Sequence, residues 1–274
     1  MSSNISCSIC GSTGELTEEQ QLRIERYSIK NTRSIDFGDL PPRVLQKIFL
    51  ALIDDNGFNF SDTSQGPWIF TYVCSSWRTA ALDHSCLWSH IILDASSLRA
   101  YSNHPAVYLK PHFRRSLKAS KYRRRQDPLS LLSIVLTRAG SHDLSVKVDY
   151  STGNIDPNQS FLMRVLLLRL AQKSRQWRSA LLCLPRYMMD DLSVVSGQFP
   201  KLVGLHLALY NNANPGNNDV ITIFETAPML TVVTLQGCAL STQISLPYQR
   251  LVHFHDDRSD GRQVNAAFPS VLST

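Results

Sequence analysis

The sequence contains no uninterrupted apolar run of the roughly 18 to 20 residues that a membrane-spanning helix needs. Its first twelve residues are polar, without the charged, apolar and small-residue segments of a signal peptide. We therefore expect a cytoplasmic or nuclear protein with no membrane partner. The six cysteines are scattered along the chain and should stay reduced in such a compartment.

The sequence also lacks the motifs of catalytic and cofactor sites: G-x-S-x-G, the P-loop, G-x-G-x-x-G and H-E-x-x-H. Two adjacent acid pairs, Asp190–Asp191 and Asp256–Asp257, would point to opposite faces of a strand and could not cooperate. We predict a protein that is not an enzyme, with no catalytic residue and no cofactor.

Three groups of residues have a spacing that could suit a metal, but an isolated motif match is weak evidence without its structural context. They are Cys7 with Cys10, then His84 with Cys86 and His90, and finally His253 with His255, Asp256 and Asp257. We predict no metal at any of them.

The net charge of +6 has a local origin in residues 110–125, which contain eight basic side chains and no acid. The chain has 28 basic residues, so 20 remain elsewhere against 22 acidic ones. A block of this kind is usually a solvated loop. Nuclear import is the second interpretation, and nucleic-acid binding, with Phe113 and Tyr122 as stacking groups, is the third and is unlikely.

Residues 40–93 have the pattern of a short helical unit with more apolar side chains than it could bury alone. Val44, Ile48 and Leu52 recur every fourth residue after Pro41 and Pro42, which suit the first turn of a helix. Leu45, Phe49 and Ile53 repeat one position further round, and Ile69, Val73 and Trp77 share a predicted face in a second helix. Surplus apolar surface on a small unit indicates a partner that covers it.

This order of features resembles the F-box, in the F-box-like form of large fungal (basidiomycete-type) families. The resemblance rests on Leu40–Pro41–Pro42, the helix with Leu45 and Phe49, the segment Val73–Cys74–x–x–Trp77–Arg78, and Leu87–Trp88. It implies a three-helix module that binds a Skp-family adaptor and, through it, a cullin. The adaptor-binding residues expected from it are Leu40, Pro41, Pro42, Leu45, Ile48, Phe49, Val73, Trp77 and Trp88.

Within this set we expect Trp77 to belong to the core of the module, and the Leu–Pro–Pro edge and the face of Leu45 and Phe49 to be contacts. Residues 54–66 form a polar insertion, which we expect to be extruded as a loop. The alternative interpretation of this region is a plain helical hairpin within a larger core.

Downstream, the pattern predicts helices at 128–138 and 161–173, strands at 144–148 and 177–182, and helix-like pieces at 188–199 and 220–227. Short blocks recur at 199–207, 227–235 and 249–254. Their anchors, Trp177, Leu202, Leu230 and Leu251, are 25, 28 and 21 residues apart. Repeats of this length resemble the leucine-rich repeat, in irregular form.

The predicted fold class is therefore α+β or α/β: a small three-helix F-box module followed by an irregular leucine-rich-repeat-like solenoid with parallel strands. The alternative is a generic layered α/β domain. The expected domains are an N-terminal extension (1–35, helical at 18–32), the F-box-like module (36–93), a basic linker (94–127), the repeats (128–258) and a tail (259–274). The end of that tail, 265–274, shows no pattern of a capping unit.

These features together predict a substrate-receptor subunit of a cullin ubiquitin ligase, whose repeats bind a protein substrate. His206, Thr234 and His253 are the first candidates for the substrate-facing surface. Two alternatives remain: a repeat scaffold outside any ligase, and a basic nuclear protein that binds nucleic acid.

Overall fold

The computed structural model describes residues 40–53, 57–98, 127–150, 157–210, 220–237 and 242–257. The chain divides into two compact units, residues 1–40 and 41–274, and every element below belongs to the second. The predicted helix at 18–32, the pair Cys7 and Cys10, the basic segment 110–125 and the tail 259–274 lie outside the described residues.

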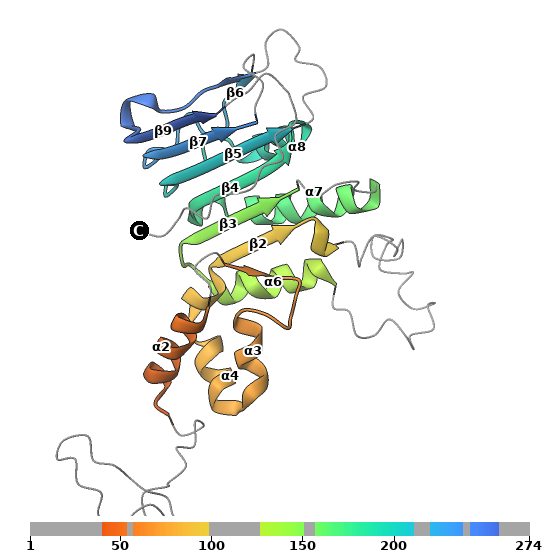
Figure 1. The fold of residues 1–274 in the computed structure, drawn as a ribbon, viewed down its shortest axis with the longest axis vertical. Coiled ribbons are helices and arrows are strands. Elements are labelled where there is room, and N and C mark those ends of the chain that lie inside the picture. Colours follow the sequence, from red (N-terminus) through yellow and green to blue (C-terminus); the bar gives the residue numbers. More distant parts are fainter. Residues whose placement is uncertain are drawn as a thin grey trace, which may run out of the picture. The chain divides into compact units, whose positions relative to one another are not determined.

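A seven-stranded sheet organises the described chain (Figure 1), and every described strand pair in it is parallel. The strands lie side by side in the order in which the chain visits them, except that β6 and β8 are left out and pair with each other instead. They are β1 (Phe58–Asn59), β2 (His90–Asp94), β3 (Leu144–Asp149), β4 (Trp177–Pro185), β5 (Gly204–Tyr210), β7 (Val232–Gln236) and β9 (His253–Asp257). The structure thus has the mixed α/β character and the parallel strands that the sequence predicts.

Strand formation follows from a period-two pattern that buries one face of the sheet. In β3, Leu144, Val146 and Val148 are buried, whereas the residues between them are half-buried. Three helices that follow or precede these strands add buried apolar side chains: α6 (Pro128–Ala139), α7 (Pro157–Ala171) and α8 (Tyr187–Leu192). The helix predictions at 128–138 and 161–173 are confirmed, although α7 begins and ends earlier.

The predicted repeat spacing is confirmed by the register of the sheet. Ser179, Gly204, Val232 and His253 occupy one row across four neighbouring strands, and they are 25, 28 and 21 residues apart. Each repeat therefore brings the backbone back to the same position along the next strand of the sheet.

The helix-like piece predicted at 220–227 is wrong. Val220 and Ile221 form β6 (Val220–Ile221), which pairs in parallel with β8 (Gln243–Ile244), and turns follow it. Ile221, Ile223 and Phe224 are all buried. Only Ile221 and Ile223 have the two-residue spacing of a strand, and so short a pattern does not distinguish a strand from a helix.

Four short helices precede strand β2 in the sequence, and we call them the helical head. They are α2 (Pro42–Leu52), α3 (Pro67–Val73), α4 (Ser75–Leu82) and the 3₁₀ helix η2 (Ser85–Trp88). The predicted single face of Ile69, Val73 and Trp77 is wrong because the helix breaks at Cys74, whose backbone is extended. Arg78 closes the break by donating from Nε to the carbonyl of Thr71 at 2.8 Å.

The polar insertion is also not an extruded loop over its described part. Phe58 and Asn59 form β1, which pairs with β2, and Phe58 and Phe60 are both buried. Gly66 closes the segment with a φ of 56°, and a side chain there would meet the Cβ atom of Phe58 at 2.5 Å. Two phenylalanines within a polar stretch anchor this segment to the edge of the sheet.

Candidate interaction surfaces

Several residues predicted to bind an adaptor form the interior of the head. Leu45, Phe49 and Trp88 have no exposed surface. The ring of Phe49 stacks on that of Phe70 at 4.1 Å between centroids and lies 5.1 Å from that of Trp77, which is half-buried. Trp88 donates from Nε1 to the carbonyl of Ala81 at 2.9 Å. These three side chains hold the head together and offer nothing to a rigid partner.

The remaining predicted positions lie at or near the surface. Pro41, Pro42 and Val73 are exposed, and Leu40 and Ile48 are half-buried. Sequence reasoning left out of its contact set five further exposed apolar side chains of the two helices: Val44, Leu50, Leu52, Ile69 and Tyr72. The spacing of Val44 and Leu52 around Ile48 was the signal that could have identified two of them.

We give the name head surface to six apolar side chains of these helices, of which five are exposed and Ile48 is half-buried. On α2 its members are Val44, Ile48 and Leu52, and on α3 they are Ile69, Tyr72 and Val73. The exposed fractions reach 66% at Leu52 and 61% at Tyr72. Exposed apolar side chains grouped on two neighbouring helices suit contact with another protein surface.

Arg138 joins the head to the sheet domain. It lies in the last turn of α6, and its guanidinium carbon is 4.8 Å from the ring centroid of Trp68 and 4.3 Å from that of Trp88. Burial lowers the pKa of Arg138, and the nearby Tyr72 opposes this shift. A cation between two indole rings fixes the head against α6.

The second candidate surface is the face of the sheet whose side chains are half-buried in β5 and β7 and exposed in β9. His206, Thr234 and His255 lie in one row across β5, β7 and β9, and His253 lies two residues from His255 on the same face. Burial lowers the pKa of His206, as does the neighbouring His255, while Gln236 opposes the shift. A neutral imidazole beside hydroxyl and amide groups gives this row hydrogen-bonding capacity with little charge.

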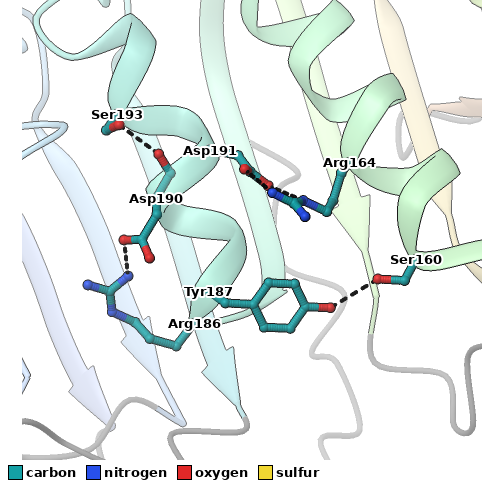
Figure 2. A network of polar contacts seen from close by, with 7 residues as sticks. All are labelled: Ser160, Arg164, Arg186, Tyr187, Asp190, Asp191 and Ser193. Carbon is teal, nitrogen blue, oxygen red and sulfur yellow. Dashed lines mark hydrogen bonds and ion pairs between the residues drawn. The ribbon is translucent and has the colours of Figure 1, made fainter. Parts of the chain in front are cut away.

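Polar contacts connect α7 and α8, as Figure 2 shows. Arg164 binds both carboxylate oxygens of Asp191, from Nε at 2.7 Å and from a terminal nitrogen at 2.6 Å. Asp190 instead accepts from Arg186 at 3.0 Å. The two adjacent acids lie on a helix rather than on the strand considered above, and each pairs with a separate arginine.

Metal and membrane sites find no support in the described part of the chain. Among these residues no group of three or more His, Cys, Asp or Glu side chains is placed to hold a metal ion. Within the same ranges no helix has both the length and the apolar character that crossing a membrane requires.

Comparison with known proteins adds no relative. No family model matches the chain, and no curated protein and no solved structure matches it at a significant level.

Proposed function

We propose that this protein is a substrate receptor of a cullin ubiquitin ligase, in which the helical head binds a Skp-family adaptor and the sheet domain binds a protein substrate. The observation that carries the proposal is the head surface. Its apolar side chains remain exposed although the head already has a complete core of Leu45, Phe49, Phe70 and Trp88. Side chains that the fold does not need, yet leaves in water, are best explained by a partner.

The motif positions support the adaptor as that partner. Pro41 and Pro42 are exposed at the start of α2, at the Leu–Pro–Pro edge on which the F-box resemblance rests. Val73 is 55% exposed at the end of α3. The proposed contact set is therefore Pro41, Pro42 and the head surface, with Leu40 at its margin.

The sheet domain supports the second half of the proposal. We interpret it as an irregular leucine-rich-repeat-like solenoid, because its strands follow chain order and its rows repeat every 21 to 28 residues from β4 onward. The row of His206, Thr234 and His255, with His253 beside it, is the proposed substrate surface. A receptor of this kind needs no catalytic group, since it acts by raising the local concentration of substrate at the ubiquitin carrier.

The test is a pull-down of purified Skp-family adaptor by the full chain and two variants. Val44→Glu/Val73→Glu places charges on the head surface, and Val194→Glu is the matched control because Val194 is 67% exposed in the 3₁₀ helix η7 (Ser193–Val195). Circular dichroism shows that each protein is folded. We expect binding by the wild type and the control and loss of binding by the double variant.

Absence of adaptor binding by the folded wild type would contradict the proposal and leave a repeat scaffold as the better account. Substitution of Leu45 or Phe49 would be uninformative, because both side chains are fully buried and their loss would unfold the head.

A further inference from the structure

The last described strand of the sheet leaves an apolar end uncovered. Phe254 in β9 occupies the same row as Leu205 and Val233, which are 2% and 1% exposed, yet Phe254 is 44% exposed. Val252, just before the strand, is 71% exposed, and Tyr248 is 55% exposed. Among the described residues no strand lies on the far side of β9.

The turns that lead into β5 and β7 share one four-residue pattern. In 199–202 and 227–230 the fourth residue donates its N–H to the carbonyl of the first, at 3.4 and 3.3 Å, and proline stands second. The first and fourth side chains are buried, at 1% or less, and the third is exposed. In both cases the strand begins four residues after the proline, at Gly204 and Val232, which pair with each other.

A series of backbone hydrogen bonds accompanies these turns. Val203 donates to the carbonyl of Arg178 at 2.8 Å, Thr231 donates to that of Val203 at 3.0 Å, and Val252 donates to that of Thr231 at 2.8 Å. Each residue just before a strand thus binds its counterpart in the previous repeat. The next acceptor in the series is the carbonyl of Val252.

The sequence contains the same pattern once more after β9, in Phe268–Pro269–Ser270–Val271. Four residues after Pro269 is Ser273, which follows His253 by 20 residues, a spacing close to the 21 of the previous step. We propose that residues 268–272 bind the uncovered end of the sheet. Phe268 and Val271 take the buried places of the turn, and Leu272 donates its N–H to the carbonyl of Val252.

The connection is long enough for this arrangement. Ten residues, 258–267, separate the end of β9 from Phe268. The connection that follows β7 is of similar length, with nine residues between the end of β7 and Leu246. Leu246 resembles Phe268 in standing directly before a proline, and it is buried. A segment of this chain with the right pattern and reach is favoured over a second copy, which would have to supply the apolar cover through an unrelated surface.

Hydrogen exchange of the full chain tests the proposal with Val271→Asp and its neighbour Ser270→Asp, which adds the same charge at the exposed third position of the turn. We expect Val271→Asp to speed amide exchange in 248–257 by about tenfold, because burial of the valine is lost. Ser270→Asp should exchange as the wild type does. Phe268→Asp should behave like Val271→Asp.

Light scattering, run on the same samples, separates the occupants. Equal exchange in all variants, with a monomeric wild type, would overturn the proposal. A dimer whose segment 248–257 is protected regardless of residue 271 would overturn it as well, in favour of a second copy at this end of the sheet.

Discussion

Removal of the Arg138 side chain should loosen the attachment of the head to the sheet domain. The guanidinium carbon lies within 5 Å of two indole rings, at 4.8 Å from Trp68 and 4.3 Å from Trp88. Trp68 belongs to α3 and Trp88 to η2, so one side chain from α6 contacts two separate elements of the head.

The expected magnitude follows from competing effects. Each cation–π contact at a partly buried site contributes on the order of 1 kcal/mol, and the aliphatic stem adds packing. Burial of the charge, which also lowers the pKa of Arg138, offsets part of this gain. We expect Arg138→Ala to reduce the free energy of unfolding by about 2 kcal/mol, or roughly 4–8 °C in Tm for a chain of this size. Arg138→Met, which keeps an apolar stem, should lose about half as much.

Urea unfolding followed by circular dichroism measures both variants, with Arg169→Ala as the control. Arg169 is exposed on α7 and donates to the side-chain oxygen of Gln172, so its loss should change stability by less than about 0.5 kcal/mol. If Arg138→Met proves as stable as the wild type or more so, the cation contributes nothing and the reasoning is refuted.

Three further predictions concern the sheet domain and its edge. Gly66→Ala should lower the free energy of unfolding in urea by at least about 2 kcal/mol, because φ at Gly66 is 56° and the new Cβ would meet Phe58. Gly204→Ala is the control and should lower it far less, because no atom lies within 4 Å of the position that its Cβ would take. A double-mutant cycle with Arg164→Ala and Asp191→Ala should give a coupling of about 0.5–1 kcal/mol that weakens with salt; a coupling of zero would show that the pair in Figure 2 is only geometric. The pKa of His206 is lowered below its usual 6.5, so on acidification the unfolded chain takes up the proton before the folded chain does, and stability falls as the pH drops below 6.5. Tm measured at several pH values should therefore fall less steeply in His206→Gln than in the wild type. Identical profiles would count against the burial effect.

The repeat spacing was readable from the sequence because each strand must bury one face. Trp177, Leu202 and Leu230 are fully buried, and apolar anchors of this kind recur wherever the chain returns to the sheet. The spacing of 25, 28 and 21 residues was therefore present in both the pattern and the register.

The head was harder to predict because its apolar stripe on α2 is wide. Period alone cannot say which side of such a stripe faces the core, and the structure buries Leu45 and Phe49 while leaving Val44 and Leu52 in water. The break at Cys74 leaves no mark in composition, since an extended backbone at one residue interrupts an otherwise helical run. β1 was missed because only Phe58 and Phe60 signal it within a polar segment.

The pairing of Arg138 with two tryptophans could not be predicted at all. Trp68, Trp88 and Arg138 are separated by 20 and 50 residues, and only the folded arrangement of α3, η2 and α6 brings them together. Long-range contacts of this kind depend on topology rather than on local pattern.

The most direct test of the central claim is a hydrogen-exchange footprint of purified Skp-family adaptor on the wild-type chain. The account predicts slower exchange in α2 and α3 on addition of adaptor, and unchanged exchange in β5, β7 and β9. Protection confined to the strands, or no protection at all with an active adaptor, would contradict the proposal that the head is the adaptor-binding module.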